Sequence, residues 1–128
     1  RDATDVIELL ERNNVATMGR VRDNQIHFPL TRAECLEALD DFVTKRLPLF
    51  GTYQDAMTVK HPLLYHANLS FAMNTKLISP NDVIDAAVQT YRDRPEEIAI
   101  NQVEGFVRQI RGCREYMRRG YGSRRPPV

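Results

Sequence analysis

Apolar residues recur along the chain at steps of three and four, the spacing typical of amphipathic helices. No stretch alternates apolar and polar residues for long, so the pattern does not predict a β-sheet. We expect an all-α fold, an irregular multi-helix domain that takes up residues 1–128 as one unit. The expected helices run from about Val6 to Leu10, from Thr31 to Val43, over residues 64–74, from Pro80 to Tyr91, and from residue 95 to Gly120.

Two of these helices begin with strong capping patterns. Thr31 and Glu34 have the spacing of a capping box, in which the hydroxyl accepts from one N–H of the helix start and the carboxylate accepts from another. Ser79, Pro80 and Asp82 provide an N-cap residue, a first-turn proline and an early acidic residue. These two helix starts are therefore the best determined.

The segments outside these helices contain residues that interrupt regular structure. Residues 14–29 follow two asparagines and are predicted to form a loop. Pro48 and Gly51 are expected to end the preceding helix, and Pro62 disfavours a continuous helix further along. Residues 49–64 are therefore predicted to be a compact, partly irregular connector.

Length and composition narrow the class of protein. With 128 residues, of which 42% are hydrophobic, the chain can bury one core. A formal net charge of +1 is too small to indicate a nucleic-acid or membrane partner by itself, and no apolar run is long enough to span a bilayer. Cys35 and Cys113 lie too far apart to suggest a disulfide framework or a self-contained metal site. We expect a cytoplasmic protein without a membrane partner.

The last expected helix has an unusual face. Gly105, Gln109 and Gly112 fall on it at steps of four and three. A glycine inside a helix costs about 1 kcal/mol relative to alanine, so two on one face indicate that something approaches closely. One interpretation is a tightly packed neighbouring helix. The other is a flat ligand that lies against the bare backbone, with Gln109 hydrogen-bonded to its polar edge.

Five arginines crowd the same helix between residues 108 and 119. Glu104 with Arg108, and Glu115 with Arg119, are spaced four apart, so much of this charge is expected to form a solvated face of ion pairs. Arg114 differs because it falls on the apolar stripe. There a guanidinium is expected to need a carboxylate, phosphate or aromatic partner.

A group of polar side chains precedes the expected short helix. His66, Asn68 and Ser70 lie where that helix should begin after Pro62. A helix start can hold a phosphate because its unpaired N–H groups and its dipole both favour negative charge. On the residues alone, a self-capped helix start that binds nothing and a structural histidine are the simpler interpretations. The three histidines of the chain lack the spacing of a metal site.

Three ordered segments together resemble one protein family. The stretch LPLFGTYQDAM at 47–57 is similar to the segment that leads into the flavin pocket of iron-sulfur bacterial cryptochromes and photolyases. The stretch HANLSFAMNTKLISP at 66–80 resembles the pattern by which photolyases hold the FAD diphosphate. The segment EGFVRQI at 104–110, followed by REY at 114–116, resembles the helix that lies between flavin and DNA lesion in that family.

The resemblance implies a helical FAD-binding domain that uses light energy to repair a pyrimidine dimer or a (6-4) lesion in damaged DNA, or to signal. It also implies contacts to the FAD phosphates and ribityl chain, made by Tyr53, His66, Asn68, Leu69 and Ser70. Near the isoalloxazine ring it implies Gln109 and Arg114. As contacts to the lesion it implies Glu104 and Arg108.

Two departures from the family pattern bear on its chemistry. His66 and Ala67 stand where the family has Thr-Ser, which suits the iron-sulfur branch. Cys113 stands where many relatives have tryptophan, and the chain contains no tryptophan that could relay electrons. Cys113 is a candidate ligand of the family's 4Fe–4S cluster, with a lone buried thiol as the other interpretation.

We expect the chain to be a fragment of a photolyase-type FAD-binding domain. It begins at Arg1 without methionine and ends in a basic, proline-rich tail that includes Arg124 and Arg125. The N-terminal antenna domain and the C-terminal remainder of the family are absent, so the fragment alone is expected to be inactive and to need the rest of a bacterial parent protein. Two alternatives stay open: a small helical module that binds nucleic acid through its last helix, and a protein-interaction domain without catalysis.

Overall fold

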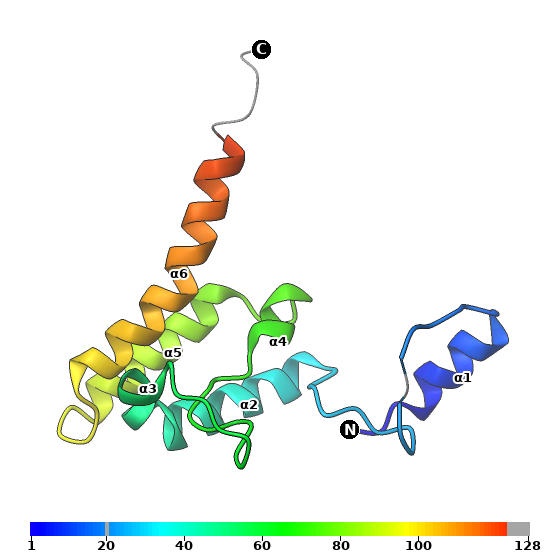
Figure 1. Ribbon diagram of the computed structural model, residues 1–128, viewed down its shortest axis with the longest axis horizontal. Coiled ribbons are helices and arrows are strands. Elements are labelled where there is room, and N and C mark those ends of the chain that lie inside the picture. Colours follow the sequence, from blue (N-terminus) through cyan, green and yellow to red (C-terminus); the bar gives the residue numbers. More distant parts are fainter. Residues whose placement is uncertain (20, 123–128) are drawn as a thin grey trace.

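The computed structural model describes residues 1–19 and 21–122, and these residues form helices without strands (Figure 1). Two isolated bridges, Asp2 with Gln25 and Arg22 with Gln25, are the extended pairings among them. The predicted all-α fold is confirmed. The helices are α1 (Thr4–Arg12), α2 (Arg32–Lys45), α3 (Leu47–Tyr53), α4 (Ser70–Asn74), α5 (Pro80–Asp93) and α6 (Ile100–Gly122). Within the described part of the chain, no helix is both long and apolar enough to cross a membrane.

The core lies where α2, α3, α5 and the first half of α6 pack together. Three phenylalanines from three helices meet at its centre. The Phe106 ring centroid lies 4.7 Å from that of Phe42 and 5.2 Å from that of Phe50, and Phe42 and Phe50 meet edge to face at 5.7 Å. Aromatic pairs at these separations contribute beyond the area they bury. The second half of α6 projects beyond the other helices (Figure 1).

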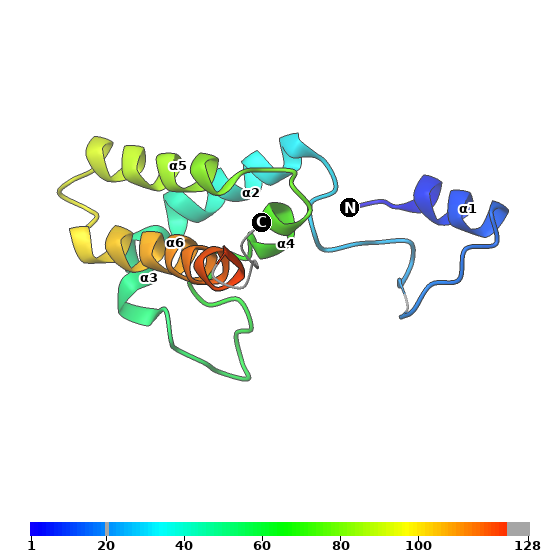
Figure 2. The same cartoon turned by 90° about the horizontal axis from the view of Figure 1, so that it is seen from above.

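Helix α1 lies apart from the other helices in both views (Figures 1 and 2). None of its own residues is buried. Its start is held by Ala3, which is buried and whose N–H donates to the Asn24 carbonyl at 2.8 Å. The Arg1 guanidinium forms an ion pair with Glu34 at 2.7 Å, which connects this unit to the start of α2.

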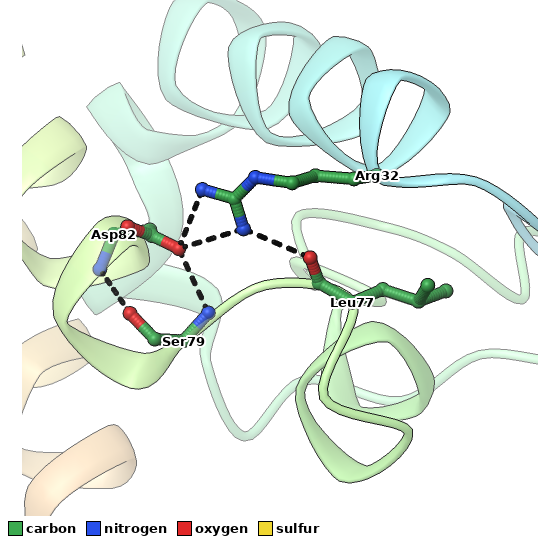
Figure 3. Close-up of polar contacts among 4 residues, drawn as sticks. All are labelled: Arg32, Leu77, Ser79 and Asp82. Atoms are coloured by element: carbon green, nitrogen blue, oxygen red, sulfur yellow. Dashed lines mark hydrogen bonds and ion pairs between the residues drawn. The ribbon is translucent and has the colours of Figure 1, made fainter.

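Both predicted capping boxes are present, at Thr31 for α2 and at Ser79 for α5. Arg32 links the two helix starts (Figure 3). Its guanidinium donates to the Leu77 carbonyl at 2.9 Å and to the Asp82 carboxylate at 3.2 Å. The same carboxylate accepts from the Ser79 N–H at 2.8 Å, so one acidic group caps α5 and binds α2.

Replacing Asp82 with asparagine is expected to destabilise the protein at about pH 7 and to destabilise it less at about pH 3. The backbone N–H of Ser79, together with the Arg32 guanidinium, lowers the pKa of the Asp82 carboxyl below its usual value of 3.8. The stabilisation from a lowered pKa is present above that usual value and is lost as the pH falls through the lower, folded-state value. Urea unfolding at the two pH values measures the effect, and a difference that does not change with pH would contradict it.

The connector after α2 differs from the prediction, because it contains a helix of its own. Pro48 follows the end of α2 and occupies the first turn of α3. Proline lacks a backbone N–H, and the N–H groups of a first turn have no partner within the helix, so no hydrogen bond is lost there. Gly51 lies inside α3 rather than at a break. The connector predicted to be partly irregular over residues 49–64 is therefore helical as far as Tyr53.

Three other helix boundaries were also predicted wrongly. The short helix begins at Ser70 rather than near residue 64, because Leu64 and Asn68 adopt left-handed backbone angles, with φ of 44° and 55°. The last helix begins at Ile100 rather than at 95, after a turn in which the Ile98 N–H donates to the Arg94 carbonyl. It also continues past Gly120.

Candidate functional site

Two adjoining hollows lie where α4 and the loop before it face α6. The outer one has a volume of about 490 Å³ and extends along α6 to Met117. The inner one has a volume of about 320 Å³ and reaches the core at Phe50 and Phe106. They share four lining residues, Ser70, Met73, Gln109 and Ile110.

Six of the seven residues predicted to contact a cofactor line these two hollows. His66, Asn68 and Leu69 line the inner hollow and Arg114 lines the outer one, while Ser70 and Gln109 belong to both. The structure thus brings together segments that are about 40 residues apart in the sequence. We call these two hollows, with the six residues, the α4–α6 site.

Tyr53, the seventh residue, lines neither hollow of the α4–α6 site. It lies at the end of α3, where its ring stacks on that of Tyr65 with 5.1 Å between the centroids. Its predicted cofactor contact therefore has no support from its position.

The polar groups of the α4–α6 site are largely without partners. Among the described residues, no hydrogen bond is formed by the side chains of His66, Asn68 or Ser70. The Gln109 amide donates to Gln54 Oε1 across a long 3.4 Å. These groups can therefore bind a ligand without first breaking strong internal bonds.

Arg114 does not have the partner that was expected for it. Its guanidinium donates to the Ile110 carbonyl at 3.0 Å and to Met73 Sδ at 3.6 Å, and no carboxylate or aromatic ring of the described residues contacts it. Because the side chain is only part-buried, water can solvate the rest of the charge. Within the described residues Arg114 thus has neither a carboxylate nor an aromatic partner, and a phosphate partner stays a prediction.

The two glycines of the α6 face have different environments. A Cβ added to Gly105 would lie 3.0 Å from Gln54 Oε1 and 3.6 Å from the Gly51 Cα, so a neighbouring helix explains this glycine. A Cβ added to Gly112 would meet nothing within 4 Å. The helix-packing interpretation therefore holds for one glycine, and bare backbone is open at the other. Gly51, where an added Cβ would lie 2.7 Å from the Asn101 carbonyl oxygen, was predicted from the sequence only as a helix end and not as a packing contact.

The two predicted lesion contacts lie further toward the start of α6. Glu104 and Arg108 form the expected ion pair, with 2.7 Å between Oε1 and Nη2. Both line a hollow of about 440 Å³ between α3 and α6 that also includes Gln109. This hollow therefore continues from the α4–α6 site along the same helix.

The second half of α6 carries the other ion pairs. Glu115 accepts from Arg118 at 2.7 Å and from Arg119 at 2.8 Å, and these bonds lower its pKa to about 2. The expected solvated face of ion pairs is thus confirmed. The basic tail at Arg124 and Arg125 lies outside the described residues.

Cys113 is exposed and lines the outer hollow, so the interpretation of a lone buried thiol is wrong. The buried cysteine is Cys35, where burial raises the pKa of the thiol. The described residues contain no group of three His, Cys, Asp or Glu side chains that could hold a metal ion. Among the described residues, Cys113 therefore has no neighbouring group of side chains with which it could hold a metal ion or cluster.

No protein-family model matches the chain. The chain is 40% identical over 114 residues to a (6-4) photolyase from Agrobacterium fabrum, a match that covers 89% of this chain and 22% of that protein. This chain is a sequence relative of a photolyase. It is also 35% identical over 69 residues to an uncharacterized protein of Acanthamoeba polyphaga mimivirus, which covers 54% of this chain and 52% of the viral protein.

The predicted relationship to photolyases is confirmed by this similarity. The chain spans about a fifth of the length of the photolyase and about half the length of the viral protein. Its helical fold agrees with that expected for part of the helical domain of a photolyase. The assignment to the iron-sulfur branch stays a prediction.

Sequence reasoning missed several residues of the α4–α6 site. Met73 and Ile110 line both hollows, but in the sequence they are ordinary apolar residues of helical stripes. Gln54 was missed as the partner of Gln109 because 55 positions separate them. No local pattern marks such residues, since only the packing of α3 and α4 against α6 brings them to the site.

Proposed function

We propose that this chain is part of a FAD-dependent, light-driven DNA photolyase, or of a related cryptochrome, in the iron-sulfur bacterial branch of the family. The observation that carries the proposal is the gathering of six residues around the α4–α6 site, in a chain related to a (6-4) photolyase. Those residues were named from motifs in two separate segments. Their convergence is the arrangement that one shared ligand requires.

The chemistry of the site fits a flavin dinucleotide. No aspartate or glutamate is among the residues that line the two hollows, so an anionic diphosphate would meet no opposing carboxylate. Arg114 supplies positive charge, and Phe106, Ile110 and Met73 supply apolar surface for a flat ring system. Open backbone at Gly112 leaves room along the same helix.

The residues then have distinct roles toward the cofactor. His66, Asn68 and Ser70 would donate hydrogen bonds to the phosphates and the ribityl chain, and Gln109 would bond the polar edge of the ring. Arg114 would favour negative charge beside it. When bound, FAD would supply the light-driven electron transfer on which lesion repair depends.

Damaged DNA is the proposed partner of the whole protein. The hollow that contains Glu104 and Arg108 adjoins the α4–α6 site through Gln109, so a base placed there would lie next to the flavin. Enzymes that act on a base take it out of the helical stack into such a pocket. Arg108 is well exposed on α6, where it can also contact phosphate.

For the cluster, we propose Cys113 as one cysteine ligand of a 4Fe–4S centre. Such a cluster takes four thiolates, and Cys35 is buried in the core on α2, away from the outer hollow. The other three ligands would come from another part of a longer protein. An exposed cysteine is compatible with this role, because a ligand must be accessible to the incoming cluster.

Replacing Gln109 with leucine is expected to raise the dissociation constant for FAD by about five- to tenfold, the typical effect of losing one hydrogen bond to a ligand. Leucine keeps a similar volume but cannot donate to the ring. Titration of the purified chain with FAD, followed by quenching of flavin fluorescence, measures the constant.

Gln89→Leu is the matched control, because Gln89 is an exposed glutamine on α5 that bonds only Asp93 and lines none of these hollows. It should leave FAD binding unchanged. Equal loss in both variants, or no FAD binding by the wild-type chain and by a chain extended with the rest of the parent, would overturn the proposal. Salt-dependent binding of DNA without any flavin would instead favour a nucleic-acid-binding module that uses the arginines of α6.

A further inference from the structure

A groove of about 690 Å³ lies between α5 and α6, and of its lining residues only Arg108, Ile110, Gly112 and Arg114 have a role in the proposed function. Its lining includes apolar residues, Pro80 and Ile84 from α5 and Val107 and Ile110 from α6. Arginines stand along the groove, and five arginines against two glutamates give residues 104–119 a net charge of +3. The groove is therefore apolar at its base and basic along its rim.

Arg111 is the arginine of this rim that is most available to a partner. Arg108 is paired with Glu104, and Arg118 with Glu115. Arg111 is exposed and forms no ion pair or hydrogen bond with any residue in the described part of the chain. A ligand with both apolar surface and carboxylates would fit this combination.

Helix α1 has the opposite surface. Asp5, Glu8 and Glu11 against Arg12 give it a net charge of −2, and Glu8 is paired with Arg12. Among the described residues, Asp5 and Glu11 have no ion-pair partner.

The apolar side of α1 is left open. Val6 is 53% exposed and Leu9 is 58% exposed, although both lie on one face of a strongly amphipathic helix. At 100° per residue, Asp5 lies beside this face, 40° from Leu9, whereas Glu11 lies on the opposite side of the helix. A helix with exposed apolar residues and a flanking carboxylate is typical of one that docks in a groove.

We propose that α1 of one copy docks into the α5–α6 groove of a second copy. Val6 and Leu9 lie on the apolar base, and the carboxylate of Asp5 faces the basic rim at Arg111. Because each copy has one such helix and one such groove, two copies that exchange α1 form a closed, symmetric dimer with two identical contacts. The separation of α1 from the other helices leaves it accessible to the second copy (Figures 1 and 2).

Sedimentation velocity over a wide range of protein concentration tests the proposal. A monomer–dimer equilibrium is expected at low salt, and Leu9→Asp should raise its dissociation constant by about tenfold or more, since it places a charge on the apolar base. Arg111→Glu should weaken the dimer by about tenfold, and adding Asp5→Arg to it should recover most of the loss. The matched control is Arg92→Glu, an exposed arginine of α5 without an ion pair in the described chain and outside the groove.

Three results would overturn the proposal. The wild-type chain could stay monomeric at every concentration, the Arg92→Glu control could weaken the dimer as much as Arg111→Glu, or the reversed charge pair could fail to recover it. Binding of a duplex oligonucleotide that requires Arg111, in a chain that stays monomeric, would assign the groove to nucleic acid instead. Asp5, Leu9 and Arg111 are all exposed, so circular dichroism is expected to show that the variants fold.

Discussion

Truncating Phe106 to alanine is expected to lower the free energy of unfolding by about 3 to 5 kcal/mol. The side chain is 2% exposed, and its ring contacts those of Phe42 and Phe50 at the meeting point of α2, α3 and α6. Alanine would remove this apolar surface and leave a cavity that three helices cannot close without moving. Urea unfolding followed by far-ultraviolet circular dichroism measures the loss.

Phe28→Ala makes the same chemical change at the surface. Phe28 is 41% exposed and stacks on Phe71 with 5.0 Å between ring centroids. Its loss should cost no more than about 1.5 kcal/mol. If Phe106→Ala does not fold at all, Phe106→Leu should fold with a smaller loss. Similar losses for Phe28→Ala and Phe106→Ala would contradict the view that the three rings form the centre of the core.

The parts of the fold that were predicted correctly depend on local chemistry. The capping boxes at Thr31 and Ser79 involve residues three positions apart, so the pattern contains all the partners. The helical stripes of α2, α5 and α6 likewise repeat within one helix.

Pro48 was predicted to end a helix, but it lies in the first turn of the next one. Proline is unfavourable inside a helix and suitable in its first turn. The residue pattern alone does not distinguish a proline that ends one helix from a proline that begins another when the second helix follows directly.

The predicted site depends partly on local sequence motifs and partly on contacts between distant segments. His66, Asn68 and Ser70 were found because a motif groups them, and their convergence with Gln109 depends on how α4 packs on α6. Tyr53 belongs to the first resembling segment, but α3 turns its ring toward Tyr65 rather than into the hollows. Sequence motifs thus predicted correctly which segments of the chain meet. They predicted less well which side chains of those segments line the same cavity.

Replacing Gly51 with alanine is expected to lower the free energy of unfolding by about 2 kcal/mol, although alanine is the better helix former. The added Cβ would lie 2.7 Å from the Asn101 carbonyl oxygen and 2.9 Å from the Gln102 Cα. Both atoms belong to the backbone, so no side-chain rotation relieves the overlap, and α3 must move away from α6. That movement would also strain the bond from the Thr52 N–H to Gln102 Oε1, which is 3.1 Å long.

Gly112→Ala separates this packing effect from helix propensity. Gly112 also lies inside a helix, but an added Cβ would meet nothing within 4 Å, so alanine should raise the free energy of unfolding by up to about 1 kcal/mol. Thermal and urea unfolding of the two variants should therefore move in opposite directions from the wild-type chain. Stabilisation by both substitutions would show that α3 and α6 are not in close contact at Gly51. Gln54 and Gln109 line the hollow between α3 and α6 that adjoins the α4–α6 site, and they meet across the same two helices. That result would therefore also contradict the presence of this hollow.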